Sequence, residues 1–457
     1  AGTSLFHSDI TGKVITLDSV NAMTGAVSIT HTGSANVAID NGTTALNLGT
    51  ISAGQNFSAT SGGAITDSGV ITVAGTATFV TDVNDIDIVL DSDNAITGAL
   101  TFTTQTSGST NGADITFDNG STAISLAAFT TEGDLTLKTD AAIALTGHTV
   151  NGDLTVTSAA AISQSAALTV SGTSSFTSTG TNTNITLSTD SNAFTGAVSA
   201  VTAGSSGDVT IDNGTTALNL GTLTANGALS VRGGNGITDS GVITVSGTSL
   251  FNSDVTAKAI TLDSTNAMTG AVSITHTGSA NVAIDNGTTA LNLGTVSAGQ
   301  NFEARSGGGI TDSGVITVAG TSLFNSDVAG QVITLDSINA MTGAVSITHS
   351  GSANVAIDNG TTALNLGTVS AGQNFEARSG GGITDSGVIT VNGTSLFHSD
   401  VAGQVITLDS TNAMTGAVSI THSGSANVAI DNGTTALNLG TVTVGQNFSA
   451  TSGGEIT

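Results

Sequence analysis

The chain has 457 residues, of which 60 are Gly and none is Pro, Cys, Trp or Tyr, and only 9% are charged. Six Lys and Arg stand against 33 Asp and Glu, and the resulting formal charge of −27 argues against a nucleic-acid partner or an anionic membrane face. The absence of Cys excludes disulfides and thiolate metal sites, and no apolar run is long enough to predict a membrane span.

The same segments recur along the whole chain. The motif GT-[SA]-x-F begins at residues 2, 75, 172, 247, 320 and 393, so the starts are close to evenly spaced, with one longer interval between 75 and 172. That longer interval contains two additions, a short one in a loop near 105–114 and one 19-residue piece, 133–151, which matches the piece that follows it. We therefore predict a single continuous repeat array over residues 1–457, with one extra coil near 133–151.

Short alternating runs bounded by Gly, Asn, Asp and Ser predict strands throughout, and no run reads as a helix. In one copy the strand-like segments are ITLDS at 333–337, VAIDN at 355–359 and FEARS at 375–379. Three such coils per 73-residue repeat average about 24 residues each, which is typical of one turn of a solenoid. The sequence therefore predicts an all-β parallel β-solenoid (β-helix) of roughly 19 coils, with the right-handed winding of the crossover rule.

Two longer stretches carry a family resemblance. GGAITDSGVITVAGTATF at 62–79 and NAMTGAVSITHTGSANVAIDNGTTALNLGT at 21–50 resemble the repeat arrays of giant bacterial surface proteins of the filamentous-haemagglutinin-like kind. The resemblance covers the whole chain. It implies a parallel β-helix, an extracellular or cell-surface location, and an adhesive or structural role.

Aligning the strand signatures places charged side chains at one equivalent position of consecutive coils. Stacked Asp residues would repel one another, and four of the six basic residues fall where they relieve this repulsion. We interpret this charge column as structural; it consists of Asp91, Asp118, Lys138, Asp212, Arg232, Asp263, Asp285, Arg305, Asp336, Asp358 and Arg378.

The first repeat leaves its column without a basic residue. Asp18 and Asp40 are followed there by the neutral Thr60, so these two carboxylates are the candidates for a weak cation site. We expect no resident cofactor, and cations such as calcium only as adventitious ions or at lateral contacts. GGNGITD at 233–239 comes near a calcium-binding nonapeptide, but Thr238 stands where that motif needs Asp.

Two other recurring residues are assigned structural roles. The Asn of NGTT, first at Asn41, fits a glycosylation sequon, but the turn chemistry of Asn-Gly already explains it. Equally spaced histidines would be about 14 Å apart over three coils, too far to share one zinc ion. We expect them to be loop residues; they are His31, His276, His349 and His422.

Nearly every acidic residue belongs to the repeat, whereas an active site needs a unique cluster, so we predict no enzyme activity. We expect a structural section of an extracellular fibre, because near-identical copies serve length better than recognition of one ligand. The alternative is an adhesin module that binds a cell surface or carbohydrate through loops such as 105–114. The expected partners are other copies of the chain or further repeats, with lateral contacts through polar Ser, Thr and Asn faces.

Overall fold

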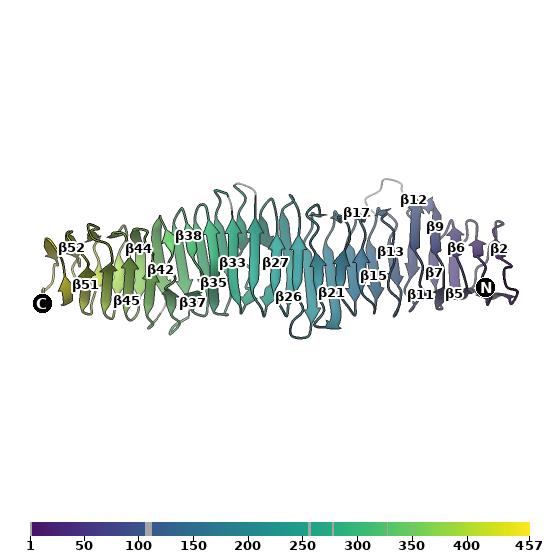
Figure 1. The fold of residues 1–457 in the computed structure, drawn as a ribbon. Coiled ribbons are helices and arrows are strands. Elements are labelled where there is room, and N and C mark those ends of the chain that lie inside the picture. The colour runs from purple at the N-terminus through teal and green to yellow at the C-terminus, as the bar shows by residue number, and fades with distance from the viewer. Residues whose placement is uncertain (1, 106–111, 255–256, 277, 327, 350) are drawn as a thin grey trace. The chain divides into compact units, whose positions relative to one another are not determined.

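The computed structural model describes residues 2–105, 112–254, 257–276, 278–326, 328–349 and 351–457. Throughout these ranges the regular structure consists of β-strands, with no helix. The chain divides into two compact units, Ala1–Gly227 and Ala228–Thr457, and within each unit the strands lie side by side (Figure 1). The predicted all-β parallel β-solenoid is confirmed, with about 21 turns rather than 19.

In the first unit, each strand pairs in parallel with strands one turn earlier and one turn later. The longest ladder runs through β1 (Ser4–Ser8), β3 (Val27–His31), β5 (Leu46–Ala53), β7 (Ile65–Asp67) with β8 (Ile71–Val73), β10 (Ile88–Leu90) with β11 (Ala95–Ile96), β13 (Ile115–Asp118), β15 (Leu135–Thr139), β18 (Leu154–Ser158), β21 (Ser174–Thr181), β24 (Val198–Ala203) and β26 (Leu218–Ala225).

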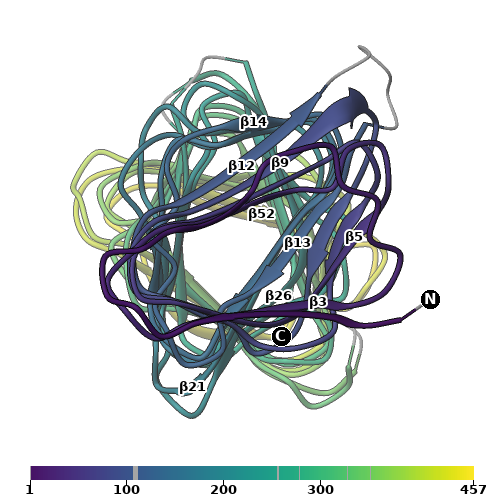
Figure 2. The same ribbon diagram turned by 90° about the vertical axis from the view of Figure 1, so that its right-hand side faces the viewer.

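Three shorter ladders complete the turns of this unit. They are β2 (Ile15–Leu17), β4 (Val37–Asp40), β6 (Phe57–Ser61), β9 (Ala77–Asn84) and β12 (Leu100–Gln105); β14 (Thr130–Thr131), β17 (Thr149–Val150), β20 (Thr169–Val170) and β23 (Ala193–Phe194); and β16 (Ile143–Leu145), β19 (Ile162–Gln164), β22 (Ile185–Leu187) and β25 (Val209–Asp212). In Figure 2 the purple and blue turns of this unit follow one another around a common interior.

The second unit contains two ladders. Ladder one comprises β28 (Ile237–Asp239) with β29 (Ile243–Val245), β31 (Ile260–Leu262) with β32 (Ala267–Met268), β34 (Val282–Asp285), β36 (Phe302–Ser306), β39 (Ser322–Ser326), β42 (Ala344–His349), β44 (Leu364–Ala371), β46 (Ile383–Asp385) with β47 (Ile389–Val391), β49 (Ile406–Leu408) with β50 (Ala413–Met414), β52 (Val428–Asp431) and β54 (Phe448–Thr451).

Ladder two comprises β27 (Leu229–Arg232), β30 (Ser249–Ser253), β33 (Ala271–His276), β35 (Leu291–Ala298), β37 (Ile310–Asp312) with β38 (Ile316–Val318), β40 (Ile333–Leu335) with β41 (Ala340–Met341), β43 (Val355–Asp358), β45 (Phe375–Ser379), β48 (Ser395–Ser399), β51 (Val418–His422) and β53 (Leu439–Thr443). The chain passes from one ladder to the other and back in every turn.

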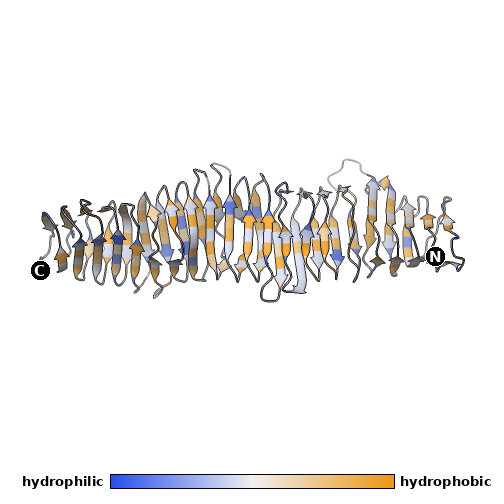
Figure 3. Ribbon diagram, viewed as in Figure 1, coloured by the Kyte–Doolittle hydropathy of each residue, from blue (hydrophilic) through white to orange (hydrophobic). Residues whose placement is uncertain are grey.

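Alternation along each strand decides what is buried. In β36 the side chains of Phe302, Ala304 and Ser306 point inward, and Glu303 and Arg305 point outward. The same alternation appears as stripes along the strands of Figure 3. One turn cannot cover its own apolar face, so the turns above and below supply the core contacts. Within the first unit this core includes edge-to-face rings such as Phe57 against Phe79, with centroids 5.8 Å apart.

Residues 133–151 form one complete turn of the first unit. β15 pairs with β18 from Leu135 opposite Leu154 to Thr139 opposite Ser158, without a shift of register. Across the same turn, Thr130 of β14 lies opposite Thr149 of β17. The inserted 19-residue piece is therefore the extra coil that its sequence predicts, and it leaves the stack in register.

The sequence repeat does not correspond to a whole number of turns. In ladder one, seven successive pairings lead from Val282 of β34 to Val428 of β52, which is its copy two repeats later. The intermediate copy, Val355 of β43, lies in ladder two. One repeat thus makes the expected three turns and a further half turn, so a turn is shorter than predicted and averages about 21 residues, within the range of solenoid proteins.

In each repeat, one long strand marks the place where a ladder changes from one continuous strand per turn to two short strands per turn. β44 pairs on one side with the single strand β42, across a register shift between Val345 and Ile347. On its other side it pairs with two short strands, β46 and β47. β35 does the same between β33 and the pair β37 and β38. Once in every repeat, therefore, the side of the turn that consists of one continuous strand is followed in the stack by a side that consists of two short strands.

The glycine of the LNLG motif permits this shift. A Cβ atom on Gly367 would lie 2.3 Å from the Ser346 hydroxyl oxygen, and one on Gly294 would lie 2.4 Å from that of Ser273. In the first repeat the equivalent Ser28 hydroxyl accepts a hydrogen bond of 3.2 Å from the backbone nitrogen of Thr50. The serine thus occupies the space that the missing side chain leaves.

We predict that Gly367→Ala destabilises the turns formed by β42, β44 and β46 by about 1 to 3 kcal/mol, because the added methyl overpacks against Ser346. In a Ser346→Ala background the hydroxyl is gone, so the same change should cost much less. Hydrogen exchange of peptides from β42 to β46 measures both. Gly147→Ala is the control, since the nearest atom to its new Cβ is 3.4 Å away. Equal costs with and without Ser346 would contradict this explanation of the glycine.

Candidate functional site

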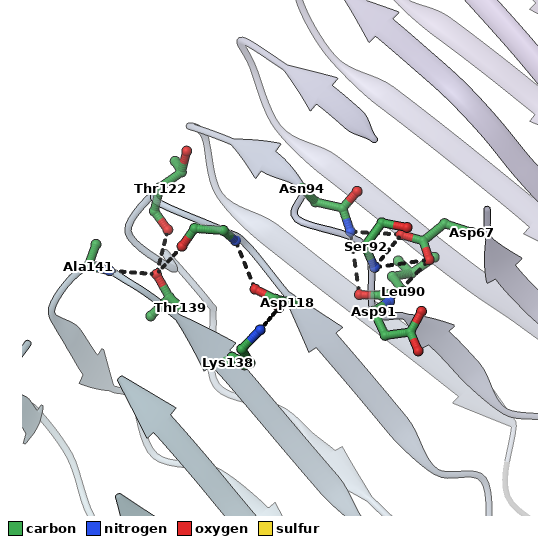
Figure 4. A network of polar contacts seen from close by, with 11 residues as sticks. Asp67, Leu90, Asp91, Ser92, Asn94, Asp118, Thr122, Lys138, Thr139 and Ala141 are labelled. Atoms are coloured by element: carbon green, nitrogen blue, oxygen red, sulfur yellow. Dashed lines mark hydrogen bonds and ion pairs between the residues drawn. The ribbon is translucent and has the colours of Figure 1, made fainter. Parts of the chain in front are cut away.

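A half-buried carboxylate and a buried amide tie consecutive turns together in the first unit (Figure 4). Asn94, which is 1% exposed, donates from its side-chain nitrogen to Asp67 Oδ2 at 2.8 Å. Asp67 Oδ1 also accepts hydrogen bonds from the backbone nitrogens of Asp91 and Ser92. Asn94 Oδ1 in turn accepts from the backbone nitrogen of Ile71 at 2.7 Å. We call this arrangement the Asp–Asn latch.

The latch recurs wherever the ITD strand is followed by NA in the next turn. The side-chain contacts are 2.7 Å long in Asp239–Asn266, Asp312–Asn339 and Asp385–Asn412. Beside the inserted coil, Gln164 replaces the carboxylate and exchanges two hydrogen bonds with Asn192. Sequence reasoning missed this element, although the constant separation of Asp and Asn along the chain was a signal for it.

Burial shifts the pKa of two latch carboxylates. Desolvation raises the pKa of Asp67 and of Asp312 above the usual value of 3.8, and the hydrogen bonds from Asn94 and Asn339 act against that rise. Without the amide donor, each carboxylate would remain half-buried with less compensation. The latch is therefore best understood as a structural element that fixes one turn on the next.

The Asn-Gly turns form a second buried series. Asn41 is 0% exposed, and its side-chain nitrogen donates to the carbonyls of Met23, Thr44 and Ala45. Gly42 follows with φ of 56°, in the left-handed region that favours glycine. The predicted turn is confirmed, and the sequon has no accessible amide. Equivalent buried residues are Asn119, Asn213, Asn286, Asn359 and Asn432.

In the first unit, the structure places the predicted charge column as the alignment expected. Asp118 lies opposite Lys138 in adjacent strands, and their side chains form an ion pair of 2.5 Å (Figure 4). This hydrogen bond raises the pKa of Lys138. Asp91 follows Leu90, which pairs with Phe117, so Asp91 comes one turn before Asp118.

In the second unit, the column is divided between the two ladders. Asp285 lies opposite Arg305 in ladder one, with Asp263 one turn earlier, beyond the pairing of Leu262 with Ile284. The copy in ladder two has the same arrangement. There Asp358 lies opposite Arg378, and Asp336 comes one turn earlier. Successive repeats therefore present the column in alternate ladders.

Two arginines of the column have partners that the alignment did not predict. Arg378 Nε donates to Glu376 Oε1 of its own strand at 2.7 Å, and this bond raises the pKa of Arg378. Arg232 Nε donates to Asp254 Oδ2 at 2.6 Å. Asp212, predicted to precede Arg232 in the column, ends β25 in the first unit, whereas Arg232 ends β27 in the second.

The weak cation candidates are neighbours in the stack. Leu17 pairs with Ile39, so Asp18 lies next to Asp40, and Asp40 lies opposite Thr60. Asp40 Oδ1 already accepts a hydrogen bond of 2.8 Å from the backbone nitrogen of Gly42. Within the described ranges, no group of three or more His, Cys, Asp or Glu side chains is arranged to hold a metal ion. Cation binding at Asp18 and Asp40 stays a prediction.

The prediction that the periodic histidines are loop residues is wrong. His31 is 1% exposed at the end of β3, and its Nε2 lies 2.5 Å from the Lys13 carbonyl oxygen. His276 makes the same contact with the Lys258 carbonyl at 2.6 Å. Alternation in the VSITH strand points its last residue inward, where the ring bridges to the loop of the preceding turn.

His148 is a further buried histidine, in the extra turn. Its ring packs edge-to-face on Phe129 with centroids 5.0 Å apart. Burial lowers the pKa of His148 to about 4, so the ring is neutral in the fold at neutral pH. In the segment 233–239, Thr238, which stands where a calcium-binding nonapeptide needs Asp, lies exposed in β28.

Comparisons with known proteins identify a repeat family. A family model described as "Repeats of unknown function (DUF5649)" matches residues 34–103, 132–201, 206–275, 279–348 and 352–421. No curated protein and no solved structure matches the chain. Across the described residues, no helix is long and apolar enough to cross a membrane.

The latch leads to a prediction. Asn339→Ala should destabilise the turns around β38 and β41 by about 2 to 4 kcal/mol, because Asp312 loses a donor and the backbone nitrogen of Ile316 loses its acceptor. The matched control, Asn354→Ala, removes only an exposed hydrogen bond to the backbone nitrogen of Asn374. Hydrogen exchange of residues 310–341 reports the local cost. Equal protection in the two variants would show that the latch is dispensable.

His148 generates a pH dependence. The unfolded chain takes up a proton at this site below about pH 6.5, and the folded chain only near pH 4, so stability is lost as pH falls through that window. We predict that His148→Leu loses less stability than the wild type between pH 7 and pH 4, by up to about 3 kcal/mol. At pH 8 the His148 ring is neutral in both the folded and the unfolded wild type, so unfolding there measures the packing effect of the substitution alone. A difference between the proteins that is the same at pH 8 and pH 4 would contradict the assignment.

Proposed function

Since the chain belongs to this family of repeats, we propose that it is a structural section of an extracellular fibre or filament built from stacked β-solenoid turns. The β-solenoid repeat architecture is the established part. The extracellular location and the fibre are our inference from it.

The observation that carries the proposal is that the buried polar side chains form their hydrogen bonds between neighbouring turns. The Asp–Asn latches, the Asn-Gly turns and the strand-end histidines all bond one turn to a neighbouring turn. Buried polar groups are costly unless they are bonded, so a fold that repeats them in every copy is specialised for holding successive turns together. A binding protein would instead direct some of them to a ligand.

The repeats also support a role in which length matters. The latch distance is 2.7 Å in three copies. Added copies therefore extend the stack without new kinds of contact, as in other solenoid proteins. We expect no substrate turnover, because the carboxylates of the latch and of the charge column recur from copy to copy and are bonded within the stack, as Asp312 and Asp118 are.

The adhesin module is the competing function. The loop that would favour it, 105–114, lies mostly outside the described residues. The following experiment distinguishes this function from the fibre.

The test extends the chain by a second copy of residues 247–392, which adds two repeats. A structural fibre predicts that cryo-electron microscopy shows an axial lengthening of about 34 Å for seven turns, with unchanged width. Antibodies against the array should label filaments on intact cells. Labelling only after permeabilisation, or glycan binding that a deletion of 105–114 abolishes, would favour a different location or the adhesin.

A further inference from the structure

The outward surfaces of the strands are divided into charged and uncharged stretches. In ladder two, β33, β35, β37, β38 and β40 point only Ser, Thr, Asn and Ala side chains outward among their described residues. The hydroxyl and amide members of this surface are Ser273, Thr275, Asn292, Thr295, Ser297, Thr311, Thr317 and Thr334. We call it a neutral face.

The strand register joins these side chains into a continuous surface. Thr275 lies opposite Ser297, and Ser297 lies opposite Thr317. A second row runs from Asn292 through Thr311 to Thr334. The nearest carboxylate within these strands, that of Asp312, turns into the latch with Asn339. Outward charges border this surface on its far side: Asp336 directly follows β40, Asp358 ends β43 one turn later, and Glu376 and Arg378 lie on β45 in the next turn.

The half-turn offset places a second neutral face in ladder one. Its members include the copies one repeat later, on β42, β44, β46, β47 and β49: Ser346, Thr348, Asn365, Ser370, Thr384, Thr390 and Thr407. Within the first unit, Thr30, Ser52 and Thr72 begin an equivalent face. The second unit therefore carries the same uncharged surface in both of its ladders.

We propose that the neutral faces are lateral contact surfaces for a second copy of this chain. The chain carries a formal charge of −27, so two copies repel each other wherever their acidic surfaces meet. A face of uncharged hydroxyl and amide groups lets two copies approach there without placing like charges opposite one another. This inference adds to the proposed fibre a description of how its chains lie side by side. It rests on the proposed function only in assuming that the chain works in an assembly.

The offset also determines what kind of assembly results. A chain with the same contact surface in both ladders engages one neighbour through each, so association does not close at a pair. Contacts of this open type generate sheets or bundles rather than a defined dimer.

Each contact is small. Four turns spaced about 4.8 Å apart, with about 25 Å of chain along the strands of each turn, give roughly 500 Å² per face. This is below the area of a standard stable interface. One face alone therefore binds weakly, and further repeats that present the same face along one side of the stack add their effects. We expect association that depends steeply on protein concentration.

Charges placed on the faces test the proposal. The variant Thr72→Glu, Thr317→Glu, Thr390→Glu introduces three carboxylates at exposed outward positions of neutral faces. The control Thr43→Glu, Thr288→Glu, Thr361→Glu adds the same net charge at exposed positions of the NGTT turns. Circular dichroism and thermal unfolding establish that both fold as the wild type does.

Sedimentation velocity over a range of concentrations then measures self-association at physiological ionic strength. We expect the wild type and the control to form species larger than a monomer, and the face variant to need at least tenfold higher concentration. A wild type that stays monomeric at millimolar concentration, or equal association of the two variants, would overturn the proposal. So would a monomeric wild type that binds a neutral polysaccharide through these threonines, since the occupant would then be carbohydrate. The fibre proposal is judged separately, by axial lengthening.

Discussion

Parallel pairing between successive turns is the constraint on which the rest of this structure depends. Every interior strand gives its backbone donors and acceptors to the turns on both sides, so each residue must suit a neighbour about 21 residues away as well as its own turn. Proline has no donor to give and is absent from the chain. The interior is filled by Val, Ile, Leu, Ala and Phe side chains, which meet the same requirement because each packs on its counterparts in the turns above and below.

The buried polar groups extend this pairing from the backbone to the side chains. An Asn whose amide bonds both the strand below and its own turn, as Asn359 does with Met341 and Ala363, holds two turns in register. Alternation with a period of two excludes a one-residue slip, but a slip by two residues would keep the apolar side chains inward. The polar contacts thus resolve an ambiguity that apolar packing alone would leave, and they explain why so many Asn residues are buried.

Because one repeat makes three and a half turns, successive copies present their surface residues on alternate ladders. Features spaced by one repeat, such as Arg305 and Arg378, belong to different ladders, while features spaced by two repeats return to the same ladder. Charged and neutral stretches consequently alternate between the ladders. This follows from the bulged LNLG strand, where one straight side of the turn becomes two short segments.

Much of the fold could be read from the residues. Alternation in segments such as FEARS predicted the strands, the repeat predicted the stack, and the match of 133–151 to its neighbour predicted the extra turn, because these are local patterns whose physical meaning does not depend on distant residues. The pairing of Asp118 with Lys138 followed from the same alignment. The family resemblance led to the same architecture but did not add a site.

The tertiary structure alone decided the phase between repeat and turn, and with it the position of every side chain around the stack. The sequence shows that a pattern returns at a fixed interval, but not whether the chain has then completed three turns or three and a half. That depends on the backbone path through the Gly367 bulge. For the same reason the burial of His31 and the partners of Asn339 were not predictable, since each is bonded to a residue of a neighbouring turn that only the three-dimensional register identifies.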